Sequence, residues 1–292
     1  MKPNLLFTTL ASSVLLLGST SFTACAKVKV YFGKGASLTA SKNIIKKSVN
    51  IDSFNSVSIP SIIDVVYTQQ GGNSVARIEA PDNLMEYVSV EVNGGTLTVT
   101  LKDLSNLNLD MNNQNILCYV NSSSLSNIDI SGTGDFNCTS LNTDKLTLSI
   151  GGTGDISFNN VKCTSSVQAS IGGTGDIDID NLECSTLSAS VGGTGDIDID
   201  NLQATSVSAN VGGTGDIELK GNVTDANYTA NGTGDIKARN LVANNVVAHA
   251  EGTGDIECYA NKSINASGSM TASVTYWGSP SSVQTGKNVS AR

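Results

Sequence analysis

The sequence has one histidine, few charged residues and no internal run of apolar residues, and these shortages exclude several classes of site. His249 is the only histidine, which excludes a multi-histidine metal site and argues against a histidine-dependent catalytic triad. No Cys-x-x-Cys pair is present, so the usual zinc spacing is missing. Beyond the N-terminus, no segment has the roughly 20 apolar residues that a spanning helix needs.

Basic residues are also scarce over most of the chain. The net charge is -9, and from Ile128 to Glu257 there are eighteen Asp and Glu against five Lys and Arg. This balance argues against nucleic acid as a partner. Residues 27–47 differ, with six Lys and no acid. We interpret that stretch as a linker; the alternative is contact with anionic lipid headgroups.

The N-terminus has the layout of a secretory signal peptide. Lys2 is followed by an apolar stretch from Leu5 to Leu17 and then by small residues, which predicts a signal peptide over 1–24. Phe22-Thr23-Ala24-Cys25 resembles a loose bacterial lipobox, so Cys25 is the expected lipidation site and the partner is a membrane reached through the anchor. The alternative is ordinary cleavage and secretion, because Ala24-Cys25-Ala26 also fits the A-x-A pattern.

A repeat of about 20 residues dominates the rest of the chain. Gly-Thr-Gly-Asp begins at Gly132 and recurs through Gly252 in seven copies spaced 19 to 21 residues apart. Within a copy, apolar and polar residues alternate, as in Ile197-Asp198-Ile199-Asp200, which is typical of half-buried strands. One unit cannot bury its apolar side alone, whereas stacked coils can. The repeat therefore predicts a parallel β-helix with ~20-residue coils; a propeller blade would need about twice this length.

Residues 48–110 are rich in predicted strands but contain no repeat, and Asn93-Gly94-Gly95 is typical of a hairpin turn. We expect this region to cap the column. The predicted organisation is a signal peptide over 1–24, an anchor cysteine and Lys-rich linker over 25–47, and a β-helix domain over 48–285. That domain divides into a cap region (48–110), repeat coils (111–275) and a C-terminal cap (276–285), and a tail follows over 286–292.

The chain resembles the putative auto-transporter adhesin, head GIN domain family of Bacteroidetes. The resemblance rests on Ser53-Phe54-Asn55-Ser56-Val57 with Ile63-Asp64-Val65-Val66-Tyr67, on the Gly-Thr-Gly-Asp-Ile copies, and on Tyr276-Trp277-Gly278-Ser279-Pro280. It implies an envelope or surface location and a β-helix fold, for which the right-handed form is expected. It carries over no catalytic residue.

The repeated aspartates are the first candidates for chemistry. Stacked coils would align them in a row of like charges, so something must offset the repulsion. We expect each carboxylate to accept N–H bonds from its own turn. The alternative is Ca²⁺, with candidate ligands Asp176, Asp178, Asp196, Asp198, Asp216 and Glu218. The turn aspartates are Asp135, Asp155, Asp176, Asp196, Asp216, Asp235 and Asp255.

The cysteines and the C-terminal aromatics leave alternatives open. Cys118 and Cys138 lie one period apart, Cys163 and Cys184 lie 21 apart, and Cys258 shares the phase of Cys138, so neighbouring pairs could face each other as disulfides or as buried thiols. Tyr276 and Trp277 could contact a partner; the alternative is that they plug the end of the column.

These patterns predict an exported, non-catalytic binding protein of the cell envelope, resembling an adhesin and contacting a glycan or an extracellular protein. No copy of the repeat carries a unique Asp, His and Arg cluster, which argues against an enzyme. The alternatives are a structural spacer or assembly factor without a ligand and, less favoured, a carbohydrate-active β-helix enzyme.

Overall fold

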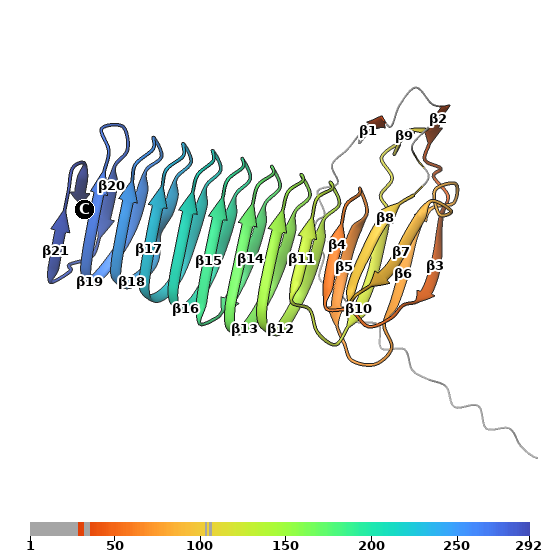
Figure 1. Ribbon diagram of the computed structural model, residues 1–292, viewed down its shortest axis with the longest axis horizontal. Helices are drawn as coiled ribbons and strands as arrows, with labels where there is room; N and C mark the ends of the chain where they lie inside the picture. The colour runs from red at the N-terminus through yellow and green to blue at the C-terminus, as the bar shows by residue number, and fades with distance from the viewer. Residues whose placement is uncertain (1–28, 32–35, 103, 105–106) are drawn as a thin grey trace, which may run out of the picture.

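The protein is an elongated stack of β-strands. The computed structural model describes residues 29–31, 36–102, 104 and 107–292, which form strands and no helix. Parallel strands build a β-solenoid of about eight turns, with a mixed β cap at one end and the C-terminus at the other (Figure 1). The predicted all-β solenoid is confirmed, and its handedness stays a prediction. The signal peptide (1–24) and Cys25 lie outside the described residues. No described segment is a helix long and apolar enough to cross a membrane.

Each coil of the solenoid runs through one long bent strand or two shorter ones. Equivalent residues of successive coils are direct partners, as for Ile177, Ile197 and Ile217. The strands are β11 (Asn127–Ile130), β12 (Phe136–Ile150), β13 (Ile156–Ile171), β14 (Ile177–Glu183), β15 (Thr186–Val191), β16 (Ile197–Val211), β17 (Ile217–Ala230), β18 (Ile236–Ala250), β19 (Ile256–Gly268), β20 (Val274–Trp277), β21 (Ser282–Thr285) and β22 (Val289–Ala291).

The core is a set of apolar columns that run along the solenoid axis. The alternation in the sequence sends every second side chain inward, so each apolar residue stacks on its counterpart in the next coil. The residue after each repeat aspartate is fully buried, and burial of each such side chain contributes about 1.5–3 kcal/mol. This column consists of Phe136, Ile156, Ile177, Ile197, Ile217, Ile236 and Ile256.

The N-terminal cap contains the first coil of the solenoid as well as antiparallel strands. Strand β4 pairs with β11, and β5 pairs with both β10 and β12, so residues 56–69 form a coil that lacks the repeat motif. The predicted hairpin at Asn93-Gly94-Gly95 joins β7 to β8. The strands are β1 (Lys29–Tyr31), β2 (Ala36–Thr39), β3 (Ile44–Asn50), β4 (Ser56–Ile59), β5 (Asp64–Gln69), β6 (Val75–Pro81), β7 (Val88–Asn93), β8 (Thr96–Leu101), β9 (Leu107–Asp110) and β10 (Leu117–Ser122).

Two segments are more ordered than the sequence indicates. The stretch 25–47, interpreted as a linker, contains β2 and the start of β3, and β3 pairs antiparallel with β6. The tail over 286–292 contains β22, which pairs with β20 in the last coil. In both places backbone pairing to another strand creates the order, and the local composition carries no repeat to indicate it.

The repeat glycines allow the main chains of successive coils to approach each other closely. A Cβ on Gly193 would lie 1.9 Å from the carbonyl oxygen of Gly173, and a Cβ on Gly195 would lie 2.0 Å from that of Gly175. Among the described residues, the glycines with positive φ are elsewhere, at Gly72, Gly94, Gly95, Gly221 and Gly278. The Gly-Thr-Gly turns therefore need glycine for space between coils and not for a left-handed backbone.

This argument predicts different outcomes for two neighbouring glycines. Gly193→Ala should lower the free energy of unfolding by about 3 kcal/mol, because the new methyl group meets rigid main chain. Gly192→Ala is the matched control, since a Cβ there would lie 3.7 Å from its nearest neighbour, the Ile171 carbonyl oxygen, and it should change stability by less than about 1 kcal/mol. Urea unfolding of both variants provides the measurement; equal losses would contradict the spacing argument.

Candidate functional site

The repeat aspartates form a hydrogen-bonded ladder along the solenoid. The Asp216 N–H donates to Asp196 Oδ1 at 2.6 Å, and the same bond joins each repeat aspartate to the previous one. The distances lie between 2.6 and 3.1 Å. In the opposite direction, Ile197 N–H donates to the Asp216 carbonyl oxygen at 3.0 Å. Each carboxylate thus accepts a hydrogen bond from the main chain of the following coil. This bond offsets part of the repulsion between neighbouring carboxylates.

The donor lies one coil further along, and this differs from the prediction that each carboxylate accepts from its own turn. The ladder also begins before the repeat, because the Asp135 N–H donates to Asp64 Oδ1 at 3.1 Å. At the other end, the Ser273 N–H and Oγ both donate to Asp255 Oδ1. Sequence reasoning missed Asp64 because no Gly-Thr-Gly precedes it; the available signal was the apolar residue that follows it, since Asp64-Val65 matches Asp196-Ile197 in this respect.

Burial sets the electrostatics of the ladder near the cap. Desolvation raises the pKa of Asp64 to about 6, against the lowering effect of the Asp135 N–H bond. Desolvation also raises the pKa values of Asp135 and Asp155, and the N–H bonds they accept partly offset it. The free-energy cost of desolvating the carboxylates is therefore largest at the N-terminal end of the ladder.

The calcium candidates form two adjacent columns. Asp178, Asp198 and Glu218 are direct partners on successive coils. Desolvation, with repulsion led by Asp198, raises the pKa of Asp178 to about 6. Lys220 Nζ lies 2.8 Å from Asp200 and 3.0 Å from Glu218 and supplies positive charge to this surface. Among the described residues, no three His, Cys, Asp or Glu side chains are grouped to hold a metal ion. Calcium binding by the predicted ligands stays a prediction.

The cysteines within the described part of the chain are free and buried: Cys118, Cys138, Cys163, Cys184 and Cys258. The expectation that Cys118 and Cys138 could face each other is wrong, because β5 lies between their strands and pairs with both. Cys163 and Cys184 occupy equivalent positions on neighbouring coils, because the residues directly before them, Lys162 and Glu183, are direct strand partners. Burial raises the pKa of four of the thiols to about 12, so they are poor nucleophiles in the folded chain; these are Cys118, Cys138, Cys184 and Cys258.

The C-terminal aromatics are placed differently from each other. Tyr276 is buried and packs beside Cys258 in the last coils, so it is not available as a partner contact. Trp277 is partly exposed, and the Arg239 guanidinium lies 4.8 Å from its ring centroid. Tyr276 fits the alternative that the aromatic residues plug the end of the column. Trp277, with the Arg239 guanidinium over its ring, is the one of the two that stays partly exposed.

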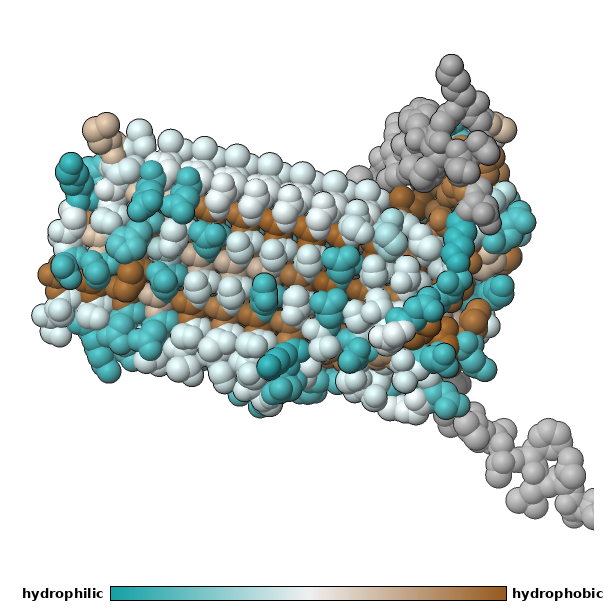
Figure 2. All heavy atoms as spheres, viewed as in Figure 1, coloured by the Kyte–Doolittle hydropathy of each residue, from teal (hydrophilic) through white to brown (hydrophobic). Residues whose placement is uncertain are grey.

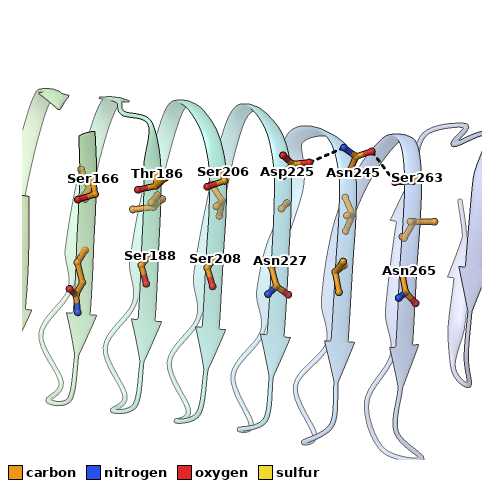
Figure 3. A pocket seen from close by; sticks show the side chains of 18 of the residues that line it. Ser166, Thr186, Ser188, Ser206, Ser208, Asp225, Asn227, Asn245, Ser263 and Asn265 are labelled. Carbon is orange, nitrogen blue, oxygen red and sulfur yellow. Dashed lines mark hydrogen bonds between the residues drawn. The ribbon is translucent and has the colours of Figure 1, made fainter. Parts of the chain in front are cut away.

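A long groove runs across the coils on one face of the solenoid. It has a volume of about 780 Å³ and crosses β13, β15, β16, β17, β18, β19 and β21. Its walls are two outward rows of mostly short polar side chains, and buried aliphatic residues such as Leu187 and Val207 lie between the rows. Figure 3 shows the labelled side chains in two lines, one residue of each line per coil. The first row is Ser166, Thr186, Ser206, Asp225, Asn245, Ser263 and Ser282; the second is Gln168, Ser188, Ser208, Asn227, Val247, Asn265 and Gln284.

The groove carries hydroxyl and amide groups and little charge. Its one ionisable side chain, Asp225, accepts a bond of 2.8 Å from Asn245 Nδ2, and Asn245 Oδ1 accepts one of 2.9 Å from Ser263 Oγ (Figure 3). Figure 2 shows the wider pattern, in which apolar rows along the long axis alternate with rows of small polar residues. The available signal in the sequence was the second alternating run of each coil, such as Leu187-Ser188-Ala189-Ser190-Val191, whose outward residues are small and polar.

A family model matches residues 53–214 and, again, residues 161–280. Its description is "Putative auto-transporter adhesin, head GIN domain". The chain belongs to this family. The resemblance carried by the Gly-Thr-Gly-Asp copies is therefore confirmed.

Solved structures share the fold at low sequence identity. A putative adhesin from Parabacteroides distasonis ATCC 8503 has a TM-score of 0.69 at 17% identity, over 88% of this chain and 100% of that one. A putative lipid binding protein from the same strain has a TM-score of 0.63 at 21% identity, over 88% and 99%. A putative adhesin from Parabacteroides merdae ATCC 43184 has a TM-score of 0.60 at 20% identity, over 88% and 99%. No curated protein matched the chain. The family and these structures are described as adhesins or lipid-binding, not as enzymes.

The ladder predicts that an acceptor, and not a charge, is needed at each repeat aspartate. Asp196→Ala should lower the free energy of unfolding by about 1–3 kcal/mol, because the Asp216 N–H loses its partner. Asp196→Asn keeps an acceptor oxygen and should lose much less. Thermal unfolding of the two variants compares them, and equal destabilisation would show that the hydrogen bond is not what matters.

The raised pKa of Asp64 predicts that the stability of the fold decreases as the pH rises. Its pKa in the folded chain, about 6, lies above the ordinary 3.8, so the folded state holds the proton more tightly. Its stabilising contribution is full below about pH 4 and is lost as the pH rises through about 6. Between pH 4 and 7 the wild type should therefore lose about 2–3 kcal/mol more than Asp64→Asn. Urea midpoints across this range test it, with the exposed Asp52→Asn as control; parallel curves for Asp64→Asn and wild type would contradict it.

Proposed function

We propose that this protein is an exported, membrane-anchored, non-catalytic binding protein of the bacterial cell envelope, and that its groove binds an extended, uncharged glycan. The groove is the observation that carries the proposal. It presents one or two polar side chains per coil across seven strands, and its one acid is occupied by an amide. A neutral ligand with many hydroxyl groups is the chemical match for such a surface.

The spacing of the coils favours a polymer that lies along the solenoid axis. Equivalent side chains recur about every 4.8 Å, the distance between paired strands. This repeat is comparable with the length of one sugar unit in an extended glycan chain, whereas an extended peptide advances only about 3.3 Å per residue. Each contact would be weak, and the affinity would come from the repetition of equivalent contacts.

Membrane attachment is proposed from the N-terminal sequence. Cys25 follows the predicted signal peptide directly, and its acylation would hold the protein at a membrane surface. The adhesin description of the family supports a location at the cell surface. Labelling with radioactive palmitate should be lost in Cys25→Ser, and protease added to intact cells should cleave the protein if it faces outward. Palmitate labelling that persists in Cys25→Ser would contradict lipidation at this residue.

Groove binding predicts that bulky changes on two neighbouring coils weaken binding without unfolding the protein. Ser188→Arg with Ser208→Arg should weaken binding to neutral linear glycans at least tenfold, because both side chains project from the groove wall. Asn210→Arg is the matched control, since this exposed residue lies on β16 outside the groove lining. Glycan-array binding and melting temperature are measured for each variant.

Two outcomes would redirect the proposal. Equal glycan binding by the groove variant and the control would place the site elsewhere. Absence of binding by the wild type to glycans and to extracellular matrix proteins would favour a structural spacer, for which the regular ladders of the solenoid are suited.

A further inference from the structure

We propose that the cap end of the protein docks on an anionic lipid bilayer through the free edge of β3, so that the solenoid projects away from the membrane. The docking edge consists of Lys42, Ile44, Ile45 and Lys47. This inference rests on the proposed membrane location, and its first test is independent of lipidation.

Strand β3 exposes aliphatic side chains on both of its faces. Ile44 is 40% exposed and Ile45 is 38% exposed. Neighbouring residues of a strand point to opposite faces, so the two isoleucines flank the edge of the sheet. Among the described strands, β3 pairs only with β6, which leaves its other edge open. The isoleucine side chains suit the boundary with the acyl chains, while the unpaired N–H and C=O groups of the edge stay hydrogen-bonded to water and headgroups.

Charge on and around β3 has the sign that an anionic surface attracts. Between Lys42 and Asn50 the edge segment carries three lysines, Lys42, Lys46 and Lys47, and no acid. The paired strand β6 adds Arg77 and Glu79, and the acids Asp52, Asp82 and Glu86 follow the two strands. Lys46 lies 3.0 Å from Glu79, and Arg77 lies 3.7 Å from the same carboxylate. Lys42 and Lys47 are exposed, and neither forms an ion pair with a residue that the structure describes. The β3 edge itself is therefore positive in a chain whose net charge is -9.

The path of the chain brings the predicted anchor to the same end. Strand β1 pairs with β9, and β9 pairs in turn with β2, which leads through Ala40 towards β3. Only the segment from Cys25 to Lys29 separates the anchor from β1, and its reach is about 14 Å. Figure 1 shows β1, β2, β3 and β9 at one end and the C-terminus at the other. A lipid on Cys25 would thus hold the cap, and not the far coils, against the bilayer.

A competing explanation is that the lysines protect an open edge from pairing with another chain, which is a common role of edge lysines. The two roles predict different results. Edge protection predicts self-association when the lysines are removed. Membrane docking predicts loss of binding to anionic vesicles by a chain that stays monomeric.

The first experiment measures vesicle binding by the full chain carrying Cys25→Ser, which cannot be acylated at this residue. Lys42→Gln with Lys47→Gln should weaken binding to vesicles of phosphatidylcholine and phosphatidylglycerol about fivefold for each lysine. Binding should also fall with added salt. The matched control, Lys145→Gln with Lys262→Gln, removes the same charge from exposed positions on the solenoid and should bind like the parent.

Further variants separate the contributions. Ile44→Thr with Ile45→Thr keeps β-branched side chains in the strand and should also weaken binding. Vesicles of phosphatidylcholine alone measure any binding by the N-terminal apolar segment, which all variants share. Equal binding by the β3 lysine variant and its control would overturn the proposal. Retained binding together with self-association on size-exclusion chromatography would overturn it in favour of edge protection.

The second experiment tests orientation with a fluorescent dye on an introduced cysteine in the same Cys25→Ser chain. The native thiols are buried and should label poorly. Met270, 92% exposed near the C-terminal end, and Glu86, exposed in the cap, are each replaced by Cys. Energy transfer to an acceptor in the bilayer should be strong from Glu86→Cys and weak from Met270→Cys. Equal transfer would show that the solenoid lies flat and would overturn the proposed orientation.

Discussion

The close approach of main chains at the Gly-Thr-Gly turns is the constraint on which the rest of the structure depends. A Cβ at Gly193 would lie 1.9 Å from a carbonyl oxygen of the previous coil, so the coils can stack in register only if that position lacks a side chain. Once the coils stack in register, equivalent residues of successive coils lie next to each other. The buried isoleucine column, the aspartate ladder and the rows of the groove all consist of residues that occupy one phase of the repeat.

The same register also creates the main electrostatic cost of the fold. Like carboxylates stand about 4.8 Å apart along the ladder, and the structure offsets their repulsion by giving each of them a main-chain donor from the following coil. Asp64 shows the limit of this compensation, because burial beneath the cap raises its pKa to about 6 in spite of the hydrogen bond. The ladder therefore serves the stacking of coils, and the uncharged groove on another part of each coil is the better candidate for ligand binding.

The two ends of the solenoid are unlike each other, and this gives the molecule a direction. The cap covers the first coils with antiparallel strands and ends in β3, where apolar and cationic side chains are exposed together. The far end closes with β21 and β22, whose residues are mostly exposed and carry no charge. A protein held at its cap would present the groove along its length to whatever lies beyond the membrane surface.

The sequence by itself determined the period, the strand alternation, the stacked coils and the family, because each of these follows from residues that recur in one phase. It could not place Asp64 at the start of the ladder or β5 between Cys118 and Cys138, since both depend on pairing across 53 to 71 residues without a repeat. The groove and the exposed edge of β3 were likewise decided only by the tertiary structure. A repeat states which residues share a column, whereas the neighbours of that column are set by main-chain contacts between segments distant in sequence.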